Sequence, residues 1–208
     1  MSEPTDWIAW HRQYDEAGSS LSRRLAVVRS RLERILNERR VTTVLSLCAG
    51  DGRDLIPILA GREAAPMATL VEAHPDLAAA AALAASEAGL SDQVCVRVAD
   101  AGVTASFSDV LPVDLLMLCG IFGNISETDI RVTISAVGAI TAPDATVVWT
   151  RGCSDPDLRP AIRGWLAAAG FDDVGFEAEP DGFGVGVARR TPNAAAGDLP
   201  DRLFTFLR

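Results

Sequence analysis

The chain has 208 residues, of which 49% are hydrophobic, and its formal net charge is −9 at pH 7. This length and composition indicate one globular domain with a sizeable core and exclude a disordered chain. The sequence holds no apolar run of membrane-spanning length, and its acidic balance disfavours phosphate-rich nucleic acid as a partner. The four cysteines follow no metal-ligand spacing, and the acidic, polar first residues do not resemble a signal peptide. We therefore expect a reduced, cytoplasmic protein without a bound metal.

Residues 1–40 are predicted to form two helices in front of the main domain. Trp7, Trp10, His11 and Tyr14 follow the i, i+3, i+4, i+7 spacing of a single helical face. Two interpretations are open: this face packs on the body, or it is a lid over a pocket, which the pairing of a histidine with the only tyrosine favours. A longer helix follows Ser19. We expect its basic face to be mainly solvated; its members are Arg23, Arg24, Arg29, Arg31 and Arg34.

Residues 44–54 form an apolar run that ends on glycines and is followed by a helical pattern. Val44, Leu45 and Leu47 fit a short strand that is buried on both faces. The turn at residues 49–52 carries no large side chain, so a ligand can approach its backbone closely. A helix is predicted from Asp54. In open α/β sheets, ligands bind at such a junction between a strand end and a helix start.

The pattern of strand followed by helix continues along the chain. Further strands are predicted at residues 68–72, 94–99, 113–119 and 146–150, and further helices from Pro75, Ser126 and Pro160. Two β-like runs, 174–179 and 183–188, are separated by a turn sequence and should pair antiparallel. The alternation predicts a doubly wound, Rossmann-like α/β sheet with helices on both faces. Residues 191–208 are expected to form a tail that packs back on residues 41–190.

Polar residues stand at or just after the ends of four predicted strands: Asp51, Glu72, Asp100 and Asn124. The carboxyl ends of the strands of a doubly wound sheet line one crevice. A carboxylate after the second strand can accept both hydroxyls of a ribose, and one after the third can accept the amino group of a purine. Acidic strand ends disfavour a phosphate and favour a cation. The sequence therefore predicts a pocket for a phosphate-free nucleoside that carries positive charge.

With these motifs in this order, residues 40–190 resemble the class I S-adenosylmethionine-dependent methyltransferases. The matching segments are residues 44–52, 71–73, 99–101 and 118–124. The resemblance implies a seven-stranded sheet in the order 3-2-1-4-5-7-6 with the last strand antiparallel. It also implies S-adenosylmethionine as cofactor and S-adenosylhomocysteine as product. The implied donor site consists of Cys48, Ala49, Gly50, Asp51, Gly52, Glu72, Ala73, Asp100, Ala101, Cys119 and Gly120.

The chain departs from the family pattern in its first motif. The family usually has an acidic residue at the position of Ser46 and a glycine at that of Cys48, so the ammonium group of the donor would rely on Asp51 or on main-chain carbonyls. Two alternatives to a methyltransferase stay open. One is a non-catalytic S-adenosylmethionine-binding regulator or partner subunit. The other is a nicotinamide-dependent oxidoreductase, which is disfavoured because Leu55 stands where that fingerprint needs its third glycine.

Candidate residues for chemistry lie outside the donor motifs. An acceptor that starts protonated needs a base near pH 7, and His11 is the candidate if the first helix folds over the site. Tyr14 would then orient the donor or the acceptor. The expected acceptor is a small molecule, and the expected partners include neither nucleic acid nor membrane; the chain is expected to be a monomer or a homodimer. The candidate acceptor wall is Trp10, Phe122, Asn124, Trp149 and Arg151, with helix capping as an equal alternative for Asn124.

Overall fold

The computed structural model describes residues 13–16, 18–180 and 182–207. Its centre is a seven-stranded sheet in the order β3-β2-β1-β4-β5-β7-β6. The strands are β1 (Thr43–Leu47), β2 (Met67–Glu72), β3 (Val94–Val98), β4 (Val113–Leu118), β5 (Thr141–Gly152), β6 (Phe171–Ala178) and β7 (Phe183–Arg190). Neighbours among β1 to β5 are parallel, whereas β7 runs antiparallel to both β5 and β6. The predicted fold class and strand order are therefore confirmed.

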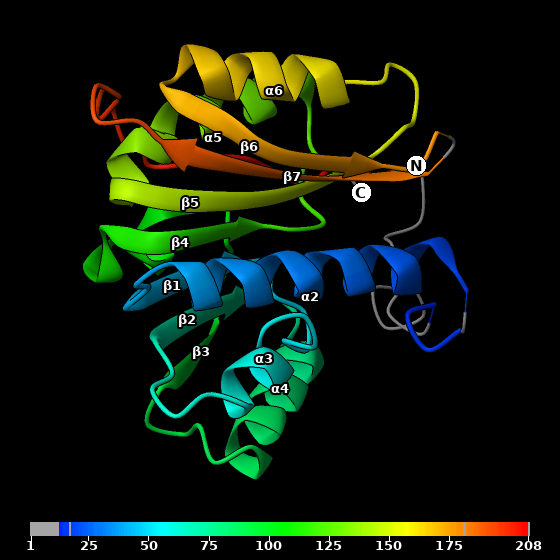
Figure 1. Cartoon of the computed structure of the whole chain (residues 1–208), viewed down its shortest axis with the longest axis vertical. Helices are drawn as coiled ribbons and strands as arrows, with labels where there is room; N and C mark the ends of the chain where they lie inside the picture. Colours follow the sequence, from blue (N-terminus) through cyan, green and yellow to red (C-terminus); the bar gives the residue numbers. More distant parts are fainter. Residues whose placement is uncertain (1–12, 17, 181, 208) are drawn as a thin grey trace.

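Helices cover both faces of this sheet (Figure 1). They are α2 (Ser20–Glu38), α3 (Ile56–Ala60), α4 (Pro75–Glu87), α5 (Glu127–Ile140) and α6 (Arg159–Ala168), with short 3-10 turns η1 (Thr104–Ser106) and η2 (Ser108–Val110). Successive strand residues point to opposite faces, so Leu115 packs with α2 and α4, while Leu116 packs with α5 and α6. The apolar runs read from the sequence thus supply two cores, one on each face.

Local sequence signals set most of the helix ends. The Ser19 side chain accepts a hydrogen bond from the Ser22 N–H at 3.0 Å, and that of Ser126 accepts one from Asp129 at the same distance. Pro75 occupies the first turn of α4, where its missing N–H costs nothing. Helix α3 begins at Ile56, two residues later than expected from Asp54, because the chain first completes turns that end in the Leu55 N–H to Gly52 carbonyl bond.

The basic face of α2 is not simply solvated, which corrects the expectation from the sequence. Arg23 forms an ion pair with Glu179 (2.5 Å), and Arg31 forms one with Glu177 (2.9 Å), both at the β6 end of the sheet. Arg29 donates to the carbonyl of Arg53 at 3.0 Å in the turn after β1. These contacts fix α2 at two places: beside β6 and at the turn after β1.

The tail returns to the carboxyl ends of the strands. Leu203 and Phe204 are buried, and the Leu203 N–H donates to the Gly102 carbonyl at 2.8 Å. The Leu207 N–H donates to the Asn124 carbonyl at 2.9 Å. Consequently the tail joins the loop after β3 to the loop after β4. Within the described part of the chain, no helix is long and apolar enough to span a membrane.

Gly186 on β7 lies directly beneath an indole ring. It pairs with Trp149 of β5, and a Cβ atom at this position would lie 2.2 Å from Cε2 of that ring. Trp149 in turn stacks on Phe176 of β6, with ring centroids 5.8 Å apart. The side chain of Trp149 is therefore part of the core and packs directly on the backbone of Gly186.

We expect the substitution Gly186→Ala to lower the free energy of unfolding by about 1–3 kcal/mol, because the added methyl group overpacks the core. Gly164→Ala on the exposed side of α6, where a Cβ meets nothing within 4 Å, is the matched control. That control should raise the free energy of unfolding by about 0.5–1 kcal/mol. Urea denaturation of the three proteins measures both changes. Equal stability of Gly186→Ala and the unsubstituted protein would contradict the tight contact.

Candidate functional site

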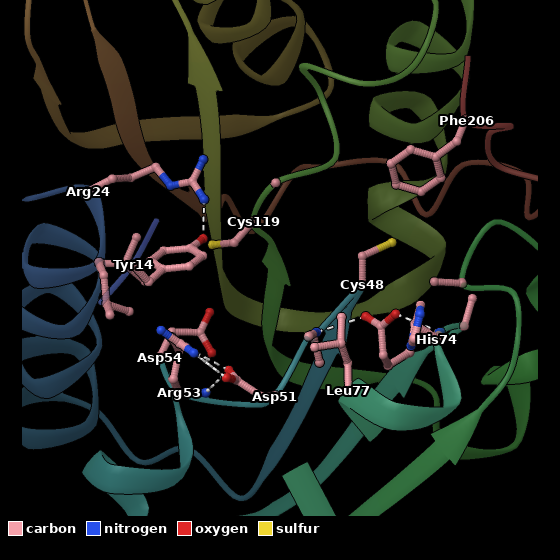
Figure 2. A pocket seen from close by; sticks show the side chains of 18 of the residues that line it. Tyr14, Arg24, Cys48, Asp51, Arg53, Asp54, His74, Leu77, Cys119 and Phe206 are labelled. Carbon is pink, nitrogen blue, oxygen red and sulfur yellow. Dashed lines mark hydrogen bonds and ion pairs between the residues drawn. The ribbon is translucent and has the colours of Figure 1, made fainter. Parts of the chain in front are cut away.

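A cavity of about 360 Å³ opens at the carboxyl ends of the central strands (Figure 2). Its size falls within the usual range of ligand pockets, about 300–1,000 Å³. The loops after β1, β2, β3 and β4 all contribute to the lining. Four further parts of the chain complete it: Tyr14 from the turn at residues 13–16, Arg24, Leu25 and Val28 from α2, Pro75 and Leu77 from α4, and Phe206 from the tail.

The donor-site residues expected from the sequence are brought together here, with one exception. The cavity is lined by Cys48, Ala49, Gly50, Asp51, Glu72, Ala73, Asp100, Ala101, Cys119 and Gly120. Gly52 is not in the lining. It is buried under the turn with a φ of +70°, and a Cβ there would lie 2.4 Å from Cδ1 of Ile56. Gly52 thus shapes the turn, and its own surface does not face the cavity.

The turn after β1 is held in a left-handed conformation. Cys48 has a φ of 55° and Gly50 a φ of 59°. A non-glycine residue in this region costs about 1–2 kcal/mol, so Cys48 is strained where the family usually has glycine. Two hydrogen bonds fix the turn in place: Ala49 N–H to the Val71 carbonyl (3.1 Å) and Gly50 N–H to Oε2 of Glu72 (2.8 Å).

Two carboxylates converge at one end of the cavity. Glu72 accepts from Gly50 through Oε2 and from the N–H of His74 through Oε1 at 2.8 Å. Asp100 accepts from the N–H of Gly102 at 2.8 Å and forms an ion pair with Arg202 at 2.9 Å. Burial, together with the negative charges of Glu72 and Asp100, raises the pKa of the Cys48 thiol well above its usual value. Both carboxylates therefore act on the same side chain, that of Cys48.

The other end of the cavity holds charges of both signs (Figure 2). Arg24 donates to the hydroxyl of Tyr14, whose pKa is raised, mainly by burial. Asp54 lies beside them, and burial, reinforced by the charge of Asp51, raises its pKa to about 6. Oδ1 of Asp54 is buried and has no hydrogen-bond partner among the described residues. Asp51 is held by Arg53, with Nη2 and Oδ2 2.6 Å apart.

The expected acceptor wall is not found at the cavity, and the prediction for its described members was wrong. Phe122 and Trp149 are buried in the core with ring centroids 6.3 Å apart. Phe122 follows β4 and Trp149 lies within β5, and both side chains pack on the face of the sheet that α5 and α6 cover. Trp10 and His11, like Trp7, lie outside the described residues.

The two polar members of that wall brace loops. The Asn124 side chain donates to the Gly120 carbonyl at 2.7 Å, and its backbone carbonyl accepts from the tail. Arg151 is buried and donates to the carbonyls of Phe122 and Pro156. Neither side chain lines the cavity. A polar residue just past a strand end can turn either way, and the sequence pattern alone did not distinguish the two directions.

Several lining residues were missed from the sequence, chiefly Arg24, Asp54 and Phe206. Arg24 belongs to a helix that precedes the first motif, and Phe206 follows the last strand. No local pattern connects either residue with the strand ends. Asp54 lies two residues after Gly52, so its position next to the glycine turn could have identified it as a lining residue.

No family model and no curated protein matches the chain. Among solved structures, it is similar to magnesium protoporphyrin IX methyltransferase from Synechocystis PCC 6803 with bound S-adenosylmethionine (14% identity, 90% of this chain and 92% of that chain, TM-score 0.66). It is also similar to an O-methyltransferase family protein from Burkholderia thailandensis (16%, 90% and 69%, TM-score 0.62). A third is a riboflavin-derivative dimethyltransferase, RosA, from Streptomyces davawensis (22%, 91% and 62%, TM-score 0.57), less than two thirds of which the chain spans.

The strand order and these similarities together show that the chain has the class I S-adenosylmethionine-dependent methyltransferase fold.

The environments of the cysteines predict their order of alkylation. Cys95 is exposed on edge strand β3, whereas Cys48 and Cys119 line the cavity. Burial also raises the pKa of both cavity thiols, so little of the reactive thiolate forms. Iodoacetamide at pH 8 should therefore modify Cys95 first, as measured by peptide mass spectrometry. Earlier modification of Cys48 or Cys119 would contradict the enclosed site.

Proposed function

We propose that this protein transfers a methyl group from S-adenosylmethionine to a small-molecule acceptor. The observation that carries the proposal is that Glu72 and Asp100, at the ends of β2 and β3, line one cavity together with Cys48. Carboxylates after the second and third strands suit the ribose hydroxyls and the adenine amino group of the donor. Leu77, Ala101 and Phe206 provide an apolar surface for the flat base.

The charges of the cavity fit a ligand that is cationic overall. Its lining holds the carboxylates of Asp51, Asp54, Glu72 and Asp100, against the guanidinium groups of Arg24 and Arg53. A sulfonium is favoured among carboxylates, whereas a pyrophosphate is not. When bound, S-adenosylmethionine supplies an electrophilic methyl group; the chain's residues have to bind it, orient it and exclude water.

Charge also guides the proposal for the acceptor and the partners. A net charge of −9 disfavours a polyanion such as RNA or DNA, since such partners are bound through clusters of lysine and arginine. We therefore propose a small acceptor that enters the cavity mouth, with no nucleic-acid or membrane partner. A monomeric or homodimeric, cytoplasmic protein of one domain remains our proposal for its setting.

A nicotinamide-dependent oxidoreductase is the weaker alternative. Leu55 is fully buried in the core beneath α2 and α4. The dinucleotide fingerprint needs glycine here so that helix and strand pack closely under a pyrophosphate. The other alternative is a non-catalytic protein that binds S-adenosylmethionine in the same cavity; it would differ from our proposal only in the absence of methyl transfer.

Isothermal titration calorimetry tests the donor site. We expect S-adenosylmethionine and S-adenosylhomocysteine to bind and NAD not to bind. Glu72→Gln should weaken both affinities by about tenfold or more, because a charged acceptor is lost from the ribose position. Glu87→Gln at the exposed end of α4 is the control and should bind as the unsubstituted protein does. Binding of NAD but not of S-adenosylmethionine would overturn the proposed function.

Turnover tests the proposed base. His11 precedes Tyr14 by three residues, and Tyr14 lines the cavity, which supports a role for His11 at the site. We expect His11→Ala to reduce methyl transfer to a protonated acceptor by about 10²–10⁴-fold while donor affinity stays within a few-fold. Formation of S-adenosylhomocysteine, measured by chromatography, gives the rate. Turnover at the original rate would remove His11 from the mechanism.

A further inference from the structure

We propose that a second cavity, between α2 and the strands β5, β6 and β7, binds a small, multiply charged organic anion such as a phosphate ester or a polycarboxylate. This arginine cavity has a volume of about 320 Å³, which falls within the usual range of ligand pockets, about 300–1,000 Å³. Among the described residues, none lines both this cavity and the one at the carboxyl ends of the strands. The inference therefore does not depend on the proposed function.

The arginine cavity lies toward the amino ends of the parallel strands. Thr146 belongs to its lining and pairs with Leu115, at the start of the continuous ladder between β4 and β5. Helix α2 runs from one cavity to the other: Arg24 lines the donor site, whereas Arg31 and Glu38 line the arginine cavity. A methyl acceptor has to lie against the sulfonium of the donor, so a ligand of the arginine cavity has a separate role.

Positive charge is concentrated in this cavity. The charged residues of its lining are Arg31, Arg34, Glu38, Arg39 and Arg189. Four of the 19 basic residues of the chain therefore meet in one hollow, although the net charge of the chain is −9. Guanidinium groups this close repel one another, and a concave surface with an excess of one charge attracts ligands of the opposite charge. The lining thus favours an anion.

The helix and strand periods explain why these side chains meet. Positions 31, 34, 35 and 38 of α2 follow the spacing of one helical face, and α2 packs on β7. Val187 and Arg189 are two residues apart on β7, so both point to the side of the sheet that α2 covers. Ile35 and Val187 are buried. They give the lining an apolar part, which suits the carbon body of an organic anion.

A β-bulge borders the cavity on edge strand β6. The register between β6 and β7 shifts between Asp173 and Gly175, which makes Val174 the extra residue. Val174 and Gly175 both belong to the lining, and Val174 is 49% exposed. A Cβ atom on Gly175 would lie 3.9 Å from Nη1 of Arg31, so this guanidinium lies over the backbone of the bulge. Bulges are frequent next to functional sites, where they redirect side chains.

Two of the four arginines are held from outside the cavity. Nη2 of Arg31 lies 2.9 Å from Oε2 of Glu177. Arg39 donates to the backbone carbonyl of Asp144 at 2.9 Å and forms an ion pair with its carboxylate. Neither Glu177 nor Asp144 belongs to the lining. These two guanidinium groups are therefore kept in position, which lowers the entropy that their side chains lose when a ligand binds.

The other two arginines supply charge that the described part of the chain leaves without an ion pair. Arg34 and Arg189 are both exposed, and neither takes part in an ion pair there. Asp172 pairs with Arg189 in the strand register but lies outside the lining. A guanidinium presents several N–H donors in one plane, which matches the oxygens of a phosphate or a carboxylate. An oxyanion with more than one charge can use both arginines at once.

Calorimetry with pyrophosphate and with citrate tests the assignment and distinguishes phosphate from carboxylate chemistry. We expect at least one of the two to bind, and acetate, with its single charge, to bind far more weakly. Arg34→Gln and Arg189→Gln should each weaken that binding by about tenfold. Arg40→Gln is the matched control, because Arg40 is exposed just after α2 and lies outside the lining. It changes the net charge equally and should leave binding unchanged.

A charge added at the bulge gives an independent measurement. Val174→Asp places a carboxylate in the lining and should weaken binding of the same anion by about tenfold, because like charges repel. Val98→Asp on the opposite edge strand β3, where the valine is 63% exposed, adds the same charge elsewhere and should have no effect. Urea denaturation of every variant shows whether it is folded.

The assignment is wrong if neither pyrophosphate nor citrate binds at concentrations up to about 10 mM. It is also wrong if Arg40→Gln weakens binding as much as Arg34→Gln does, or if Val174→Asp and Val98→Asp have equal effects. Binding of a single-stranded RNA oligonucleotide, with no binding of either small anion, would instead assign this surface to nucleic acid. Each of these results leaves the calorimetric test of the donor site unaffected.

Discussion

The carboxylate of Glu72 is the contact on which the site depends. One oxygen accepts from the N–H of Gly50 and the other from the N–H of His74, so a single side chain joins the turn after β1 to the start of α4. Because the turn contains Cys48 and Gly50 in left-handed conformations, it needs such a restraint to persist. The Glu72 carboxylate thus holds the strained turn at Cys48 in place and at the same time puts a negative charge beside it.

Around this contact, the fold recruits segments that are distant in sequence. Helix α2 is held by Arg23 and Arg31 at β6, and by Arg29 at the turn after β1, so its Arg24 side chain reaches the cavity. The tail pairs with the loops after β3 and β4, which places Phe206 at the opposite end. The strand ends therefore form the base of the site. Helix α2 adds a positively charged side chain, Arg24, and the tail adds an aromatic one, Phe206.

Net charge and local charge play different roles in this molecule. The chain as a whole has a net charge of −9, whereas the cavity combines four carboxylates with two guanidinium groups. Pairing within the cavity is uneven, since Arg53 forms an ion pair with Asp51, whereas Oδ1 of Asp54 is buried and accepts no hydrogen bond from the part of the chain that the structure describes. The two ends of the cavity therefore differ in their charges, and such a difference suits an elongated ligand whose own two ends differ.

The sequence by itself determined the sheet, its strand order through the family resemblance, and the four loops that line the cavity. Such features follow from hydrophobic periodicity, from glycine at turns and from capping residues, all of which act within a few positions of the chain. The acceptor wall was wrong because Phe122, after β4, and Trp149 and Arg151, within β5, turn toward α5, α6 and neighbouring loops. Only the tertiary structure decided that Arg24 and Phe206 line the cavity. Their positions depend on packing between segments that are far apart in the chain, and no local pattern records such packing.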